Sequence, residues 1–253
     1  MKAFRPILFS TLMVEALIKL LKNQTRRIIK IPTNLTFKTL STTNRLWDST
    51  KEESPNPIKT EAVFQDTEGN EVRVKSKYQV GDVLWVRETW KFTGWSDEGD
   101  EMLVEYKDGV KQWCPIYDPH EDGMWLADQI DDLAAKGFLE PNDKTERYDV
   151  VKELHWKPSI FMPKVAPRIF LEVTNVRVER LQDISEDDAI AEGITDAAPL
   201  GFRYNGFSQF ETAKLAFKHL WQSINGEESW KSNPWVWVYD LKKVEKPENF
   251  GSK

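Results

Sequence analysis

The length and order of the apolar segments limit most strongly which folds this chain can adopt. Amphipathic helix patterns occur at 11–21, 185–192 and 211–224. Short segments in which apolar and polar residues alternate are typical of strands, and they occur at 6–9, 25–31, 82–88, 168–178 and 235–241. Strands and helices do not alternate regularly, which argues against a doubly wound parallel sheet. We therefore predict an α+β fold, a small, mixed and partly open β-barrel with peripheral helices.

Three further stretches connect these elements. Residues 61–78 are predicted to form a hairpin whose turn contains Gly69 and Asn70, whereas residues 40–60 have few large apolar side chains and are predicted to be a loop. Residues 91–150 are acidic, and we expect an irregular structure there with one helix at 124–138. We therefore expect one domain over residues 1–253, with 91–150 as an insertion or lid within it.

Composition limits the compartment and the partners. The only cysteine is Cys114, so no disulfide forms within the chain, which fits a reducing compartment. The longest uncharged stretch, Pro6–Val14, has nine residues, far fewer than the roughly 20 that a membrane helix needs. Glu15 interrupts the apolar N-terminal run, so a signal peptide is not expected. We expect a soluble, cytoplasmic protein without a membrane partner, and the net charge of −6 argues against a protein that coats nucleic acid indiscriminately.

Positive charge is nevertheless concentrated after the first helix pattern, where residues 16–47 contain seven lysines and arginines and no acidic residue. If a strand begins near Thr25, then Thr25 and Arg27 project from the same side of it, and Lys22 can swing over them from the end of the helix. An ammonium, a hydroxyl and a guanidinium would then converge. The alternative is a helix C-terminus carrying cations that suit its dipole, followed by an exposed basic strand.

Aromatic residues offer a second possible component of a site. Most of the 11 tryptophans are expected to fill the core, but a few could line a pocket for a flat, π-faced ligand. Trp85 and Arg87, on the strand at 82–88, are the candidate walls of such a pocket. The three histidines are too scattered for a metal site, and the chain has no P-loop and no dinucleotide-binding glycine motif. We therefore expect no metal and no cofactor.

Several landmarks together resemble the ASCH family, which has a PUA-like β-barrel fold and is associated with RNA and modified-nucleobase binding. The similarity is closest to longer phage and prophage members. It rests on a K-x-x-T-x-R motif after an N-terminal helix and on five stretches of sequence: LFST, KNQTRRIIK, GDVLWVRETW, WKPSIFMPK and NPWVWVY. The ISEDDAIAEGI helix pattern belongs to the same set, and the landmarks extend from residue 6 to residue 242.

One branch of that superfamily is an amidohydrolase that removes the acetyl group from N(4)-acetylcytidine. The resemblance implies that its lysine, threonine and arginine correspond to Lys22, Thr25 and Arg27, and its glutamate to Glu192. The family usually has glycine two positions before the lysine, where this chain has Leu20. Glu192 is also unusual by itself, because a carboxylate in the last turn of a helix lies at the unfavourable end of the dipole.

These observations predict a protein that binds a modified nucleoside or nucleic acid, RNA or single-stranded, and that hydrolyses an acylated nucleobase if Lys22, Thr25 and Glu192 are catalytic. Arg27, Trp85 and Arg87 would bind the substrate. A non-catalytic reader, a ribonuclease and a phage accessory or assembly protein remain alternatives, and the sequence indicates no particular protein partner. The cations expected to contact phosphates are Arg26, Lys30, Lys164 and Arg168.

Overall fold

The structure is a computed structural model of the chain. It describes residues 3–32, 34–43, 59–96, 101–115, 132–142, 147–152, 154–196, 201–204 and 207–250. The chain divides into two compact units, which are described separately. The first unit comprises Met1–Arg5, Ala16–Leu84 and Phe170–Val244, and the second comprises Pro6–Glu15, Trp85–Ile169 and Glu245–Lys253.

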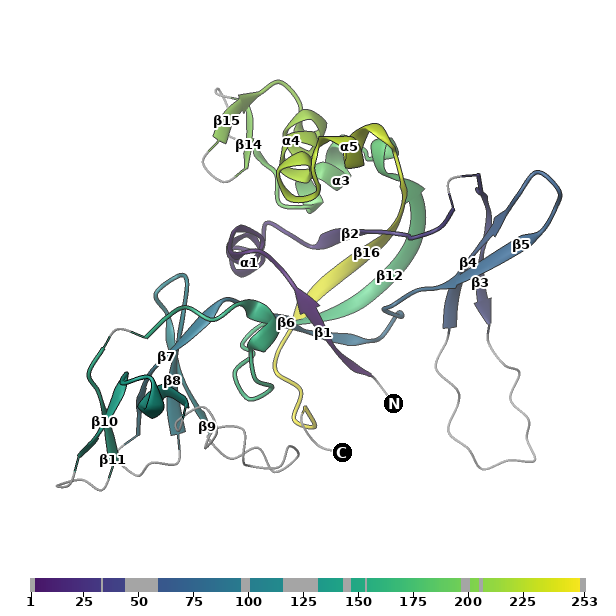
Figure 1. Cartoon of the computed structure of the whole chain (residues 1–253). Helices are drawn as coiled ribbons and strands as arrows, with labels where there is room; N and C mark the ends of the chain where they lie inside the picture. Colours follow the sequence, from purple (N-terminus) through teal and green to yellow (C-terminus); the bar gives the residue numbers. More distant parts are fainter. Residues whose placement is uncertain are drawn as a thin grey trace, which may run out of the picture. The chain divides into compact units, whose positions relative to one another are not determined.

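The largest sheet has five strands in the order β1-β6-β12-β16-β2 (Figure 1). They are β1 (Phe4–Leu8), β2 (Gln24–Ile28), β6 (Val83–Arg87), β12 (Phe170–Arg180) and β16 (Trp235–Val244). The long strands β12 and β16 pair antiparallel along their whole length, and β2 pairs antiparallel with the other edge of β16. All five strand segments expected from the alternation are therefore confirmed. Among the described strands no pairing joins β1 to β2, so the sheet is not closed, and the structure supports the α+β class rather than a specific barrel.

The three predicted helices are confirmed, and each is shorter or shifted by a few residues. They are α1 (Thr11–Ile18), α3 (Glu186–Ala191) and α4 (Ala213–Asn225); α5 (Glu227–Lys231) follows α4 and was not predicted. Helices α3, α4 and α5 gather at one end of the β12–β16 pair (Figure 1). They share an apolar core with β16, in which Phe217, Trp221 and Trp230 are the largest side chains. A small sheet of β13 (Thr195–Asp196), β14 (Phe202–Tyr204) and β15 (Phe207–Phe210) lies beside α4.

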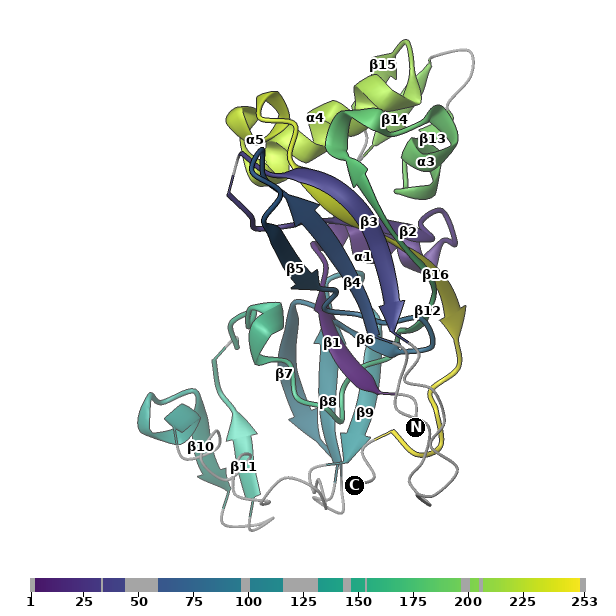
Figure 2. The same ribbon diagram turned by 90° about the vertical axis from the view of Figure 1, so that its right-hand side faces the viewer.

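The predicted hairpin is also confirmed, as part of a three-stranded sheet of the first unit (Figure 2). It consists of β4 (Lys59–Gln65) and β5 (Glu71–Lys75), and β3 (Thr36–Thr43) pairs with the other edge of β4. The expectation of a loop over 40–60 is wrong at both ends, because residues 40–43 and 59–60 belong to β3 and β4. Threonine and serine dominate β3, and they suit a strand without giving an apolar signal.

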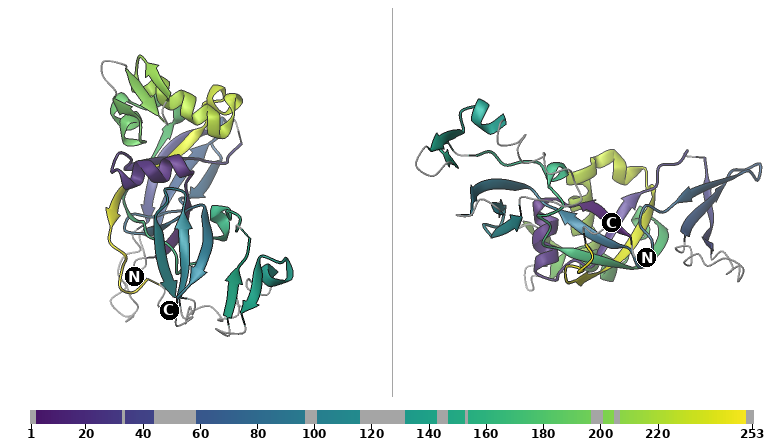
Figure 3. Two further views of the ribbon diagram at one scale, coloured as in Figure 1. Left: turned by 90° about the vertical axis from the view of Figure 1, so that its left-hand side faces the viewer. Right: turned by 90° about the horizontal axis from the view of Figure 1, so that it is seen from below.

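The second unit is more regular than its acidic sequence suggested. It contains an antiparallel sheet of β7 (Trp90–Trp95), β8 (Glu101–Tyr106) and β9 (Lys111–Pro115), and a hairpin of β10 (Leu139–Asn142) and β11 (Arg147–Val150) (Figure 3). Where residues 91–150 are described, most of them are in strands rather than in the irregular structure that was expected; residues 97–100, 116–131 and 143–146 lie outside the described residues. In β8 the buried residues Met102, Val104 and Tyr106 alternate with partly exposed ones, two of them glutamates, so the apolar face is narrow.

Most of the helix predicted at 124–138 lies outside the described residues, and 132–135 is helical. Within the part of the chain that is described, no helix is long and apolar enough to cross a membrane.

Candidate functional site

Lys22 and Glu192 form a buried ion pair in the first unit, although 170 positions separate them in the sequence. The Lys22 Nζ donates to Glu192 Oε2 at 2.5 Å and to the Glu192 backbone carbonyl at 3.0 Å. The side chains are 0 % and 3 % exposed. The two residues also form an isolated antiparallel bridge. Two positions that the family resemblance places in one site are therefore in direct contact.

The end of α1 positions Lys22. The amide of Leu21 donates to the carbonyl of Ala16 at 2.8 Å, and the amide of Leu20 donates to that of Leu17 at 3.2 Å, which is the Schellman pattern of a helix C-terminus. This pattern needs a left-handed residue, usually glycine, and Leu20 takes that position with φ of 59°. The apparent departure from the family therefore keeps the backbone conformation that glycine would provide.

The end of α3 positions Glu192 in the same manner. Ser185, a residue type favoured at helix starts, caps this helix by accepting from the Asp188 amide at 3.1 Å. At the other end, Ile194 donates to Ala189 at 3.3 Å, and Gly193 has φ of 105°. A side chain at position 193 would lie 3.2 Å from the Ala16 Cβ, so glycine also permits the close approach of α1 and α3.

A cluster of charged side chains surrounds the pair, and we call it the β2 ion cluster. Its centre is Arg26, whose guanidinium contacts Glu192 at 3.2 Å, Glu179 at 3.2 Å and Asp188 at 3.1 Å. Arg26 has a fully buried side chain, and its Nε has no hydrogen-bond partner among the described residues. The cluster joins β2, β12, β16 and α3, and its members are Lys22, Gln24, Arg26, Arg177, Glu179, Asp188, Glu192 and Asp240.

Burial changes the protonation of Lys22. Loss of hydration disfavours the ammonium and lowers the pKa of Lys22 below the ordinary 10.5, and the nearby guanidiniums of Arg27 and Arg26 act in the same direction. The carboxylate of Glu192 opposes this shift by stabilising the charged form. The amine is therefore easier to deprotonate than that of an exposed lysine, which is the state in which it can accept a proton.

Thr25 and Arg27 project from the opposite face of β2 to Gln24 and Arg26, because side chains alternate along a strand. Thr25 is 2 % exposed and pairs across the sheet with Tyr239, whereas Arg27 is partly exposed and pairs with Trp237. The prediction that these two residues share a side of the strand is therefore confirmed. The cation next to Glu192 that the sequence did not indicate is Arg26.

The residues expected to contact phosphates have different surroundings. Lys30 is exposed. Arg26, expected on an open strand face, is instead enclosed by three carboxylates. Charge alone could not distinguish a buried arginine from an exposed one. The carboxylates of the cluster lie on β12, α3 and β16, far from Arg26 in the sequence, so only the tertiary structure reveals them.

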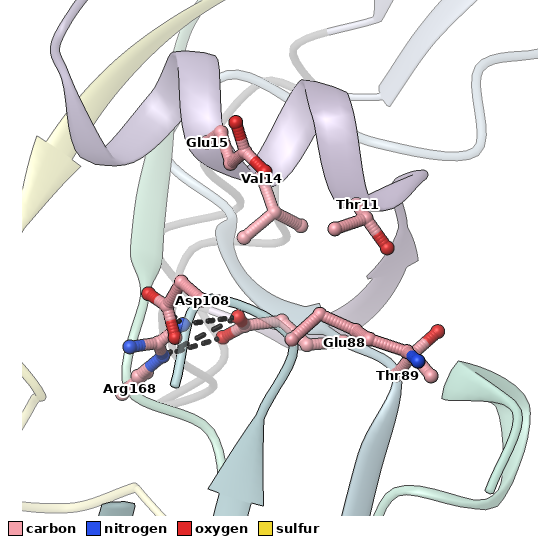
Figure 4. Close-up of a pocket in the computed structure, with 8 residues that line it drawn as sticks. Thr11, Val14, Glu15, Glu88, Thr89, Asp108 and Arg168 are labelled. Atoms are coloured by element: carbon pink, nitrogen blue, oxygen red, sulfur yellow. Dashed lines mark hydrogen bonds and ion pairs between the residues drawn. The ribbon is translucent and has the colours of Figure 1, made fainter. Parts of the chain in front are cut away.

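Arg168 also binds carboxylates of this chain, in the second unit. Its guanidinium donates to both Glu88 oxygens and to Asp108, with 2.7 Å to Glu88 Oε2 and 2.8 Å to Asp108 Oδ2 (Figure 4). Burial raises the pKa of Glu88 despite this arginine. The pocket beside the group has a volume of about 10 Å³, the space of a single water molecule, so it cannot hold a base.

Trp85, Arg87 and Lys164 belong to the second unit as well. Trp85 is 3 % exposed, and the Arg87 guanidinium lies 4.6 Å from the centre of its ring. Arg87 and Lys164 line a larger cleft with the WKPSIFMPK segment, which includes Ile160 and Phe161. Within the described residues, no group of three or more histidine, cysteine or acidic side chains could hold a metal ion.

Comparisons with protein families, with curated proteins and with solved structures found no match to this chain.

Proposed function

We propose that this chain is an ASCH-like, PUA-like protein that binds modified nucleobases and hydrolyses an acylated one, of which N(4)-acetylcytidine is the first candidate. The observation that carries the proposal is the buried Lys22–Glu192 contact, with 2.5 Å between Nζ and Oε2. A lysine with a lowered pKa next to a carboxylate is a frequent component of catalytic sites.

The chemistry assigned to the pair is acid–base assistance to amide hydrolysis. The Thr25 hydroxyl attacks the amide carbonyl and the free exocyclic amine of the base departs, which leaves an acyl ester on Thr25. Water then hydrolyses this ester, which releases a carboxylic acid and regenerates the hydroxyl. The neutral Lys22 amine accepts a proton from the attacking hydroxyl, and Glu192 orients that amine and carries a proton to the departing nitrogen. Arg27 stabilises the negative charge on the carbonyl oxygen.

Thr25 is the proposed nucleophile, a role that comes from the resemblance to the amidohydrolase branch. A threonine hydroxyl needs a base to react at neutral pH. Of the four proposed residues, Lys22, Thr25 and Glu192 are buried and Arg27 is partly exposed. Substrate entry therefore requires a local opening of the first unit, and we expect Arg27 to be the first of the four to meet the ligand.

A panel of acylated and unmodified nucleosides tests the proposal. Incubation with N(4)-acetylcytidine should release cytidine and acetate, measured by chromatography, while unmodified cytidine should be bound and left unchanged. Lys22→Met and Thr25→Ala should each lower the rate at least about a hundredfold, the scale of lost acid–base assistance. Thr25→Ser should keep part of the activity. Lys243→Gln, an exposed lysine of β16, is the matched control and should keep all of it.

The other candidate functions correspond to other outcomes of the same panel. Binding of a modified nucleoside without turnover would make the site that of a reader. Cleavage of an RNA oligonucleotide without deacylation would indicate a ribonuclease. Failure to bind any nucleoside or RNA would overturn the proposal and leave the β2 ion cluster as a structural feature.

A further inference from the structure

The second unit contains a cleft whose volume, about 670 Å³, falls within the range of roughly 300–1,000 Å³ that small-molecule sites occupy. Eight of its eleven lining residues belong to the WKPSIFMPK segment, which the proposed function does not use. The cleft is lined by Arg87, Asp132, Lys136, Trp156, Lys157, Pro158, Ile160, Phe161, Met162, Pro163 and Lys164.

A rigid turn presents two large apolar side chains in this cleft. Residues Ser159–Phe161 form one turn of 3₁₀ helix between Pro158 and Pro163, and Ile160 and Phe161 are 55 % and 63 % exposed. The backbone of the turn is held by Arg87, which donates to the Ile160 carbonyl at 3.0 Å. Met162 is 2 % exposed and anchors the end of the turn in the core of the unit. Exposed side chains on so constrained a turn are prepared for a ligand without a large ordering cost.

Positive charge dominates the same cleft. Its lining has four cations, on Arg87, Lys136, Lys157 and Lys164, and one anion, on Asp132, which gives a local charge of +3 in a chain of net charge −6. Asp132 is engaged by Lys136 at 2.7 Å. Partial burial lowers the pKa of Lys157; the carboxylate of Asp132 opposes this shift, and the charge of Lys136 adds to it. Cations that line a concave site attract an anionic ligand.

Aromatic rings accompany the cations. Lys107 and Lys91 lie 3.8 Å and 4.9 Å from the centre of the Trp156 ring, and Lys157 lies 5.4 Å from that of Trp90. Trp90 is 1 % exposed and the Trp156 ring already faces two lysines, whereas Phe161, which is 63 % exposed, offers an open ring. A cationic groove with an exposed aromatic ring is what proteins use to bind single strands, in which phosphates meet lysines and bases stack on rings.

We propose that this cleft is a second ligand site, which binds a nucleotide unit of single-stranded nucleic acid with its phosphate on Lys157 and Lys164 and its base on Phe161. The inference does not depend on the proposed function, because it uses residues of the second unit alone. An anionic membrane would also attract lysines beside exposed apolar residues, but it is a flat surface and does not fill a concave site. The concavity favours the nucleotide.

Fluorescence anisotropy of a labelled single-stranded oligonucleotide at low salt tests the site in the full chain. We expect binding that weakens as salt rises. Replacing both phosphate contacts, in Lys157→Gln with Lys164→Gln, should weaken binding at least tenfold and lower the salt slope by about 1.4, or roughly 0.7 for each contact. Phe161→Ala should weaken binding about tenfold, and Phe161→Trp should restore it. The matched control is Lys242→Gln with Lys243→Gln, two exposed lysines of β16.

Two competition arms identify the source of the ligand. If a mononucleotide displaces the oligonucleotide at comparable occupancy, the ligand of the cleft is a free nucleotide. If the mononucleotide does not displace it, the ligand is a single strand of nucleic acid. The proposal is overturned if the wild type does not bind at low salt, or if the cleft and control variants bind equally. It is also overturned if binding to vesicles of anionic lipid requires Phe161 and the two lysines while binding of the oligonucleotide does not. Oligonucleotide binding in the cleft without any deacylation would contradict only the proposed function, and deacylation without such binding would contradict only this proposal.

Discussion

Lys22 and Glu192 carry opposite charges in a buried position, so replacing either residue should lower the stability of the protein. We expect the two losses to differ, because Glu192 has a second cationic partner. Glu192→Gln removes the carboxylate that faces both the Lys22 ammonium and the Arg26 guanidinium. A buried charge that loses its partner costs about 3–5 kcal/mol. In Lys22→Met, by contrast, Glu192 keeps Arg26 at 3.2 Å. We therefore expect Glu192→Gln to lower the free energy of unfolding by about 3–5 kcal/mol and Lys22→Met by less.

Urea unfolding of the two variants and the wild type at pH 7 measures this difference. Equal losses for the two variants, or a larger loss for Lys22→Met, would mean that Arg26 does not share the carboxylate in the way the contact distances indicate.

At the scale of elements, two helix ends deliver the two members of the pair, and Leu20 is at one of them in a conformation that disfavours leucine. A left-handed residue other than glycine costs about 1–2 kcal/mol, and glycine loses part of this advantage through its greater freedom in the unfolded chain. Leu20→Gly should therefore stabilise the protein by up to about 1 kcal/mol, measured as thermal and urea unfolding. Leu21→Gly, one position along and exposed, is the control and should not stabilise. A loss of stability in Leu20→Gly would contradict the strain assigned to α1.

Gly193 ends the other helix, where an added methyl group meets both a left-handed backbone and the Cβ atoms of Ala16 and Lys22, at 3.2 Å and 3.5 Å. Gly193→Ala should cost more than about 1 kcal/mol of unfolding free energy. Gly81 also has a positive φ, of 89°, but an added Cβ there meets open space. Gly81→Ala therefore measures the backbone cost alone. If the two substitutions cost the same, the close approach of α1 and α3 is not a constraint.

The helices and strands also differ in how well the local sequence predicts them. The α3 helix was predictable with both ends, because Ser185 and Gly193 are strong local signals at the correct spacing. The three strands β7, β8 and β9 were missed, since glutamates between the buried residues of β8 made the segment resemble an irregular acidic insertion. Local propensity is a weak guide where pairing with neighbouring strands determines the structure.

For the molecule as a whole, the sequence related Lys22 to Glu192, which are in contact, but not the charged residues around them. The positions of Lys22 and Glu192 came from family resemblance, and the alternation of the strand correctly placed Thr25 and Arg27 on a common side. Neither argument could find Arg26, Glu179 and Asp188 around the pair, because they meet only after β2, β12 and α3 are assembled. Residue type alone would have left Arg26 on the surface, since arginines are rarely buried unless paired.

If Lys22 is the base and Glu192 controls its proton, the pH–rate profile of the reaction should report the protonation of Lys22. With N(4)-acetylcytidine, kcat/KM should rise with pH to a midpoint below 10.5, the ordinary pKa of lysine, because burial lowers the pKa of Lys22. Glu192 raises that pKa and Arg27 lowers it, so Glu192→Gln should move the midpoint to lower pH and Arg27→Gln should move it to higher pH. Arg27→Gln keeps the test available if Glu192→Gln does not fold. Absence of turnover, or a midpoint that neither substitution moves, would contradict the assignment of Lys22 as the base.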